Sequence, residues 1–219
     1  MNTLWTFGDS QTYGFGCRPD GPLSEYYFNY RRDGDDIWPV HLAKKLNCDL
    51  KNYGKYGASN DYIFDSILEV FSEIKENDYV VIGETYHQRF DVEDYRNGEL
   101  VSILGEIGYD EFSDGFKDWI NRICRSEEEL ITLLNFAIYF ANSNLIKNRY
   151  HKRFEFIKTI LPPNTKFLLW RWDSEINKKA QRIYQHTKGK INDTHFSFSA
   201  HKEFSQFAYK MLTEGNTLI

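Results

Sequence analysis

Strand-like runs and helical patterns alternate over the N-terminal part of the sequence, and this order constrains the fold more than any other feature. The strand-like runs at residues 4–7, 49–52 and 79–82 each end in a turn that contains glycine. Apolar side chains recur at helical spacing over residues 37–46 and 63–74, which lie between these runs. A β-α-β-α-β order with turns at the ends of the strands is typical of a parallel sheet covered by helices.

The rest of the chain is predicted to complete the same layers around an insertion. Ser126 and Glu129 form a capping box, which predicts the start of a helix. The elements expected from there on are helices at 126–142, 145–160 and 199–213 and a strand at 166–170. Residues 84–125 are acidic and irregular, and we predict a helical insertion at about 86–165. The expected fold class is α/β, a three-layer α/β/α sandwich with a parallel, flavodoxin-like sheet.

Length and composition favour a single domain over residues 1–219, because the sequence shows no linker and no internal repeat. With 41% hydrophobic and 27% charged residues, neither a disordered chain nor a membrane protein is indicated. The three cysteines are widely spaced and form no CxxC pair, which argues against a disulfide framework and a zinc site. We expect no metal ion and no cofactor.

Charge is unevenly distributed, although the net charge is only −5. Acidic residues dominate positions 84–129, and basic residues dominate positions 142–190. The net charge argues against a general nucleic-acid binder. The two segments are predicted either to pair with each other beside a site or to mark a subunit contact, and the oligomeric state stays open.

The N-terminus carries neither the basic region nor the long apolar region of a secretory signal. No stretch reaches the ~20 apolar residues of a membrane span. We therefore expect a cytoplasmic protein that does not enter a membrane. Assembly into a phage or another particle is compatible with the sequence.

Three short polar motifs stand after predicted strands or before a predicted helix. Gly-Asp-Ser at residues 8–10 follows the first strand, at the edge where open α/β sheets bind ligands. Residues 52–60 follow the second strand and contain two glycines that let the backbone approach a ligand closely. Asp193 and His195 precede the last helix and pair a carboxylate with an imidazole. Each motif alone is also compatible with an ordinary turn.

Together the motifs resemble the sequence blocks of the SGNH/GDSL hydrolase superfamily. Residues 7–14 match the nucleophile block, residues 52–57 the glycine block and residues 193–195 the closing block, in the order of the family. The resemblance spans residues 4–85 and 166–212. It implies the SGNH hydrolase fold.

The resemblance also implies a Ser-His-Asp triad. Ser10 would attack an ester carbonyl, His195 would take the proton of the serine, and Asp193 would orient the histidine. His201 is the alternative base, although we expect it inside the first turn of the last helix.

The remaining site residues are also carried over from the family. The backbone N–H groups of Ser10 and Gly57 and the side chain of Thr85 are expected to bind the oxyanion. The residues expected to contact the substrate are Asp9, Tyr13, Asn60 and Arg89.

Two departures from the family pattern bear on function. The third block usually reads Gly-x-Asn-Asp, whereas this chain has Thr85 in place of the asparagine donor. Thr85, Arg89 and Asp91 resemble a variant in which Thr or Ser is followed by Arg and an acidic residue. The closing block reads Asp-x-His instead of Asp-x-x-His and resembles that of alginate-type O-acetyltransferases.

The expected function is that of a serine esterase acting on a small acyl ester, with an acetylated carbohydrate as the candidate substrate. Two alternatives stay open at this point. One is an O-acyltransferase with the same triad. The other is a catalytically weak binding or structural module, which the missing asparagine motivates.

Overall fold

The computed structural model describes residues 1–14, 36–87, 89–94, 99–104, 124–126, 128–129, 131–133, 135–136, 144–171, 196 and 198–214. The described strands and helices account for the sheet and both of its helical layers. None of the described helices is long and apolar enough to cross a membrane.

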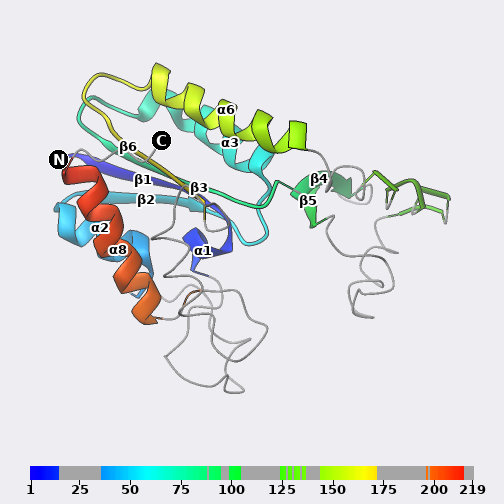
Figure 1. Cartoon of the computed structure of the whole chain (residues 1–219), viewed down its shortest axis with the longest axis horizontal. Helices are drawn as coiled ribbons and strands as arrows, with labels where there is room; N and C mark the ends of the chain where they lie inside the picture. Colours follow the sequence, from blue (N-terminus) through cyan, green and yellow to red (C-terminus); the bar gives the residue numbers. More distant parts are fainter. Residues whose placement is uncertain are drawn as a thin grey trace.

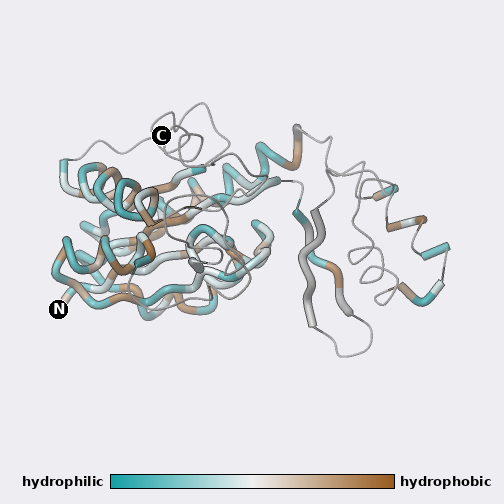
Figure 2. Tube along the Cα trace, turned by 90° about the horizontal axis from the view of Figure 1, so that it is seen from below, coloured by the Kyte–Doolittle hydropathy of each residue, from teal (hydrophilic) through white to brown (hydrophobic). Residues whose placement is uncertain are grey.

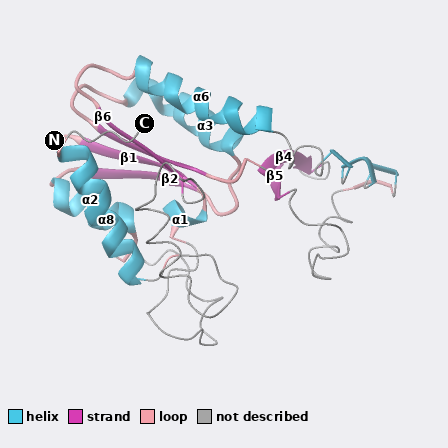
Figure 3. Cartoon of the chain, viewed as in Figure 1, coloured by secondary structure: helices cyan, strands magenta, loops and turns pink. Residues whose placement is uncertain are grey.

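Four parallel strands form one sheet in the order β2-β1-β3-β6. These strands are β1 (Thr3–Gly8), β2 (Asp49–Gly54), β3 (Tyr79–Glu84) and β6 (Lys166–Arg171). The α-helices around them are α1 (Ser10–Tyr13), α2 (Trp38–Leu46), α3 (Asn60–Val70), α6 (Asn144–Ile160) and α8 (Phe198–Thr213). In Figure 1, α3 and α6 cover one face of the sheet and α2 and α8 cover the other, and Figure 3 shows the strands between them. The predicted α/β/α sandwich with a flavodoxin-like strand order is confirmed.

Side-chain alternation along the strands divides the core into two halves. In β1, Trp5 and Phe7 pack in the cluster of α3 and α6, whereas Leu4 packs in the cluster of α2 and α8. In β3, Val80 and Ile82 take the first side and Val81 takes the second. Both faces of the sheet are therefore covered by helices. The polar side chains that follow the strands lie at the carboxyl edge of the sheet.

Asp78 fixes the start of β3 against the start of β1. Its carboxylate accepts hydrogen bonds from the Thr3 N–H at 2.8 Å and from the indole Nε1–H of Trp5 at 2.9 Å. Asp78 is 3% exposed, so these bonds are shielded from water. They hold the register in which the two strands end side by side.

Residues 89–104 differ from the prediction. They contain an antiparallel hairpin of β4 (Arg89–Asp94) and β5 (Glu99–Leu104), whereas an irregular start of a helical insertion was expected. Charged residues alternate with Phe90 and Val92 in β4, which is the period of a strand, but the acidic composition concealed it. Figures 1 and 2 both show the hairpin beside the layered domain.

The helical parts of the insertion follow the prediction more closely. The hydroxyl of Ser126 accepts a hydrogen bond from the Glu129 N–H at 3.2 Å, and residues 128–129, 131–133 and 135–136 are helical. The second predicted helix is α6. Near the N-terminus, Ser10–Tyr13 forms one helical turn, which begins at the serine of the Gly-Asp-Ser motif.

Candidate active site

The turn after β1 presents Ser10 at the carboxyl edge of the sheet. Asp9 caps α1, since its Oδ1 accepts a hydrogen bond from the Gln11 N–H at 3.0 Å. Ser10 follows as the first residue of α1 and is 4% exposed. Its hydroxyl makes no hydrogen bond to any residue that the structure describes. Ser10 thus lies at the edge where open α/β sheets bind ligands, and its role as a nucleophile stays a prediction.

The glycine block docks directly on this turn. The N–H of Lys55 donates to the Gly8 carbonyl at 3.0 Å, and the Asn52 side-chain amide donates to the Thr12 carbonyl at 3.0 Å. A Cβ on Gly54 would lie 2.5 Å from the Tyr13 backbone nitrogen, so only glycine permits this approach.

Gly57 is the second glycine of the block. Its φ is +71°, a left-handed conformation that favours glycine, and a Cβ there would meet no atom within 4 Å. The loop that carries Gly57 therefore lies beside the turn that carries Ser10 and leaves open space at the glycine.

Asn60 positions Thr85 rather than facing solvent. The Thr85 N–H donates to Asn60 Oδ1 at 2.9 Å, and Asn60 Nδ2 donates to the Thr85 carbonyl at 3.1 Å. Asn60 is completely buried, and Thr85 is 2% exposed. A contact between Asn60 and substrate stays a prediction, while its observed bonds clamp the end of β3 against the start of α3.

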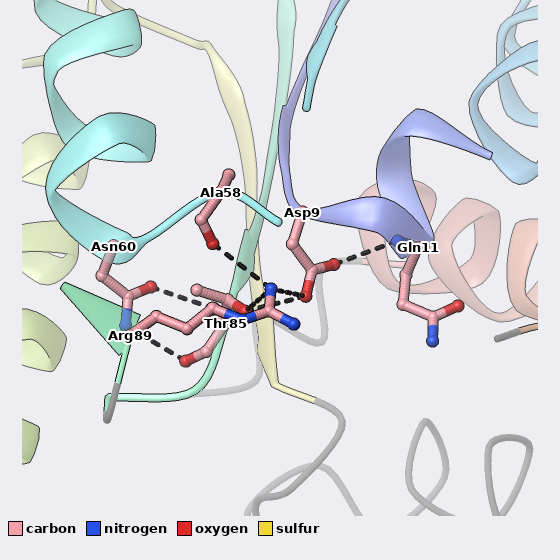
Figure 4. A network of polar contacts seen from close by, with 6 residues as sticks. All are labelled: Asp9, Gln11, Ala58, Asn60, Thr85 and Arg89. Atoms are coloured by element: carbon pink, nitrogen blue, oxygen red, sulfur yellow. Dashed lines mark hydrogen bonds and ion pairs between the residues drawn. The ribbon is translucent and has the colours of Figure 1, made fainter. Parts of the chain in front are cut away.

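Asp9, Thr85 and Arg89 form a buried polar network (Figure 4). The Thr85 hydroxyl donates to Asp9 Oδ2 at 2.7 Å. Nη1 of Arg89 donates to Asp9 Oδ2 at 3.1 Å, to Thr85 Oγ1 at 3.0 Å and to the Ala58 carbonyl at 3.3 Å. The side chains of Asp9 and Arg89 are 6% and 17% exposed, so this is an ion pair largely removed from water.

The network bears directly on the expected role of Thr85. A threonine hydroxyl has one hydrogen to donate, and here it is directed at Asp9. Donation from Thr85 to an oxyanion stays a prediction, and it would require that hydrogen to leave Asp9. The neighbouring Asp91 accepts from the Ser59 hydroxyl at 2.5 Å, so Thr85, Arg89 and Asp91 are all tied into the same edge.

His195 and Asp193 lie outside the described residues, so the triad stays a prediction. The residue after His195 is described: the Phe196 N–H donates to the side-chain Oε1 of Gln11 at 3.0 Å. Phe196 is fully buried, and its ring stacks on that of Trp170. The neighbour of the predicted base is therefore fixed to the neighbour of the predicted nucleophile.

His201, the alternative base, is buried and hydrogen-bonded to the backbone of α2. It lies in the first turn of α8, as expected, and is 1% exposed. Its Nδ1 accepts a hydrogen bond from the Trp38 N–H at 3.1 Å. The indole N–H of Trp38 in turn donates to the Gln11 carbonyl at 3.0 Å.

Sequence reasoning missed a second buried group at the same edge. Glu84 is 1% exposed, and its Oε2 lies 3.3 Å from Nδ1 of His151 on α6. Nη1 of Arg171 lies 3.6 Å from Oε1 of Glu84, an atom with no hydrogen bond to a described residue. The hydrogen bond to the Glu84 carboxylate raises the pKa of His151, while the burial of His151 acts in the opposite direction.

The described side chains offer no evident metal site. No group of three or more His, Cys, Asp or Glu among them is placed to hold a metal ion. The site chemistry that the described residues do support rests on a hydroxyl, a carboxylate and a guanidinium.

Comparison with known proteins establishes the fold. A solved acetyl xylan esterase, Est2A from the rumen bacterium Butyrivibrio proteoclasticus, matches 98% of this chain with a TM-score of 0.50 and 12% identity, and this chain covers 64% of that protein. An aryl esterase from M. smegmatis matches over 100% of both chains with a TM-score of 0.43 and 13% identity. A protein of the G-D-S-L family from Desulfitobacterium hafniense DCB-2 matches 97% of this chain and 100% of its own, with a TM-score of 0.38 and 13% identity.

The chain has the SGNH hydrolase fold, as the sequence predicted. No protein-family model and no curated protein sequence matches it. The structural likeness therefore defines the fold class, and the roles of individual residues rest on the geometry of this chain.

The Gln11–Phe196 bond predicts a local change in hydrogen exchange. Gln11→Met keeps the length of the side chain but removes the acceptor, which leaves the buried Phe196 N–H unpaired at a cost of ~1–3 kcal/mol. Amide exchange followed by NMR is expected to accelerate at Phe196 and its neighbours, while the Ile82 amide in β3 serves as the internal reference. Unchanged exchange at Phe196 would show that Gln11 does not hold this segment.

The Glu84–His151 contact predicts a pH-dependent stability. Because the pKa of His151 is raised in the folded state, its contribution is complete below the unfolded pKa of about 6.5 and is lost as the pH rises through the folded pKa. Wild type should exceed His151→Gln in free energy of unfolding by more at about pH 5.5 than at about pH 9, as measured by urea titration. A difference that is constant or grows with pH would contradict this assignment.

Proposed function

We propose that this protein is a serine esterase of the SGNH type. The observation that carries the proposal is the position of Ser10 between two anchored neighbours. Asp9 binds Thr85 and Arg89 from the end of β3 and the start of β4, and Gln11 binds the residue that follows His195. Ser10 is thus the residue on which the predicted components of an acyl-transfer site converge.

The proposed reaction follows the serine hydrolase scheme. Ser10 Oγ attacks the ester carbonyl while His195, oriented by Asp193, takes the hydroxyl proton. The negative charge that develops on the carbonyl oxygen is stabilised by the backbone N–H groups of Ser10 and Gly57. Collapse of this intermediate releases the alcohol, which receives its proton from His195. Water activated by the same histidine then hydrolyses the acyl-enzyme.

The proposed substrate is a small acyl ester on a carbohydrate, with acetyl as the acyl group. The acetyl xylan esterase with the same fold acts, by its name, on an acetylated polysaccharide. Tyr56 precedes Gly57 and is 57% exposed, so an aromatic surface suited to a sugar ring stands next to the proposed oxyanion site. Tyr13, at the end of α1, is a further proposed contact.

Two other functions have a specific observation in their favour. The Asp-x-His spacing at residues 193–195 supports an O-acyltransferase, which would transfer the acyl group to a sugar hydroxyl instead of water. The bond from the Thr85 hydroxyl to Asp9 supports a catalytically weak binding module, because it withdraws a donor. Product analysis with a glycan acceptor separates the first from an esterase.

Ser10→Ala tests the nucleophile. Loss of the attacking oxygen is expected to lower kcat for p-nitrophenyl acetate by on the order of 10⁴-fold or more and to abolish labelling by a fluorophosphonate probe. Ser126→Ala is the matched control, because Ser126 is exposed and caps a helix in the insertion. Substantial turnover in Ser10→Ala would refute the proposal, and an unlabelled wild type would favour the binding module.

A further inference from the structure

We propose that Arg89 supplies the third oxyanion donor in place of the missing asparagine. This inference rests on the esterase function proposed above and assigns a catalytic role to a residue expected only to contact substrate.

The three partners of Arg89 Nη1 are adjacent to the three predicted donors. Asp9 precedes Ser10, Ala58 follows Gly57, and Thr85 is itself the residue at the asparagine position. Nη1 lies 3.1 Å from Asp9 Oδ2, 3.3 Å from the Ala58 carbonyl and 3.0 Å from Thr85 Oγ1. The guanidinium is therefore centred where the three site-bearing segments meet.

The second amino nitrogen of Arg89 is left over for another partner. All three hydrogen bonds of the side chain to described residues use Nη1, and Nη2 makes none to them. Figure 4 shows this second nitrogen on the far side of the guanidinium from Asn60, toward the side on which Gln11 lies. Ser10 stands between Asp9 and Gln11 in the chain, so the carboxylate that binds Nη1 belongs to the residue next to the nucleophile.

Rigidity and charge make this nitrogen a suitable donor. The guanidinium is planar, so the bonds to Nη1 fix the direction of the N–H groups on Nη2. The side chain is 17% exposed, so it is not completely closed off from solvent. A charged donor makes a stronger hydrogen bond to an oxyanion than a neutral amide does.

The neighbours of Arg89 balance its charge and hold its side chain in place. Asp9 balances its charge in the resting state, and the Thr85 hydroxyl accepts from Nη1 while donating to Asp9. The donor is thus held in place before the negative charge develops, which is the requirement for electrostatic stabilisation of a transition state. In this arrangement Thr85 is a positioning residue.

Arg89→Lys is the most discriminating variant. Lysine keeps the positive charge and can reach Asp9, but it cannot hold a second donor at a fixed angle. We expect kcat for p-nitrophenyl acetate to fall ~10²–10³-fold, as it does when one oxyanion donor is lost, with KM changed only a few-fold. Affinity for methylboronic acid, whose serine adduct is a tetrahedral anion, should fall by a similar factor.

Arg153→Lys is the matched control. Nη1 of Arg153 lies 2.6 Å from Asp61 Oδ1, and the guanidinium lies over the ring of Phe64. Neither Asp61 nor Phe64 has a role in the proposed reaction. This is the same exchange in a more exposed arginine–aspartate pair, and it should leave kcat and boronate affinity unchanged. The melting temperature of both variants shows whether a loss of kcat reflects unfolding.

The possible results distinguish failure of this inference from failure of the proposed esterase function. A folded Arg89→Lys variant with kcat and boronate affinity within about threefold of wild type would overturn the inference, since one lost donor costs ~10²–10³-fold. If that variant does not fold, NMR of the wild type decides: the Arg89 Nη protons should shift when methylboronic acid binds, and unshifted Arg89 signals would overturn the inference. A wild type that neither cleaves esters nor binds boronate would instead refute the esterase function, and this inference with it.

Discussion

The buried ion pair between Asp9 and Arg89 is the interaction on which the site depends. It joins the turn after β1 to the segment after β3, and through the Ala58 carbonyl it also holds the loop after β2. Removal of one partner of this pair is expected to lower the free energy of unfolding, because it leaves a buried charge without compensation. A single guanidinium therefore contacts all three loops at the carboxyl edge, in addition to the bonds that Asn52, Lys55 and Asn60 make between them.

Much of this fold could be predicted from the sequence because its determinants are local. The period of two in the strands and the helical repeats of α2, α3 and α6 each lie within about twenty residues, and the right-handed connection of parallel strands leaves few arrangements. The cap of α3 is also local, since the Ser59 hydroxyl accepts from the Tyr62 N–H at 3.0 Å. The β4–β5 hairpin escaped because acidic side chains obscured its alternation.

The site was only partly predictable because its contacts are distant in sequence. Ser10 and Gly57 stand in recognisable motifs, but nothing local indicates that Gln11 holds Phe196, 185 residues away. Glu84 belongs to the acidic segment, and its contacts with His151 and Arg171 of the basic segment form one point where the two segments meet. Arg153 of α6 likewise pairs with Asp61 of α3, which is 92 residues away in the sequence.

Trapping of the acyl-enzyme tests whether Ser10 is the nucleophile of an esterase. Wild type mixed with p-nitrophenyl acetate and quenched in acid within its first turnover would be digested and examined by mass spectrometry. If Ser10 is the nucleophile, one acetyl group is expected on the peptide that carries Ser10, formed with the first equivalent of p-nitrophenol. Release of p-nitrophenol with the acetyl group on another residue, or with none on the protein, would contradict it.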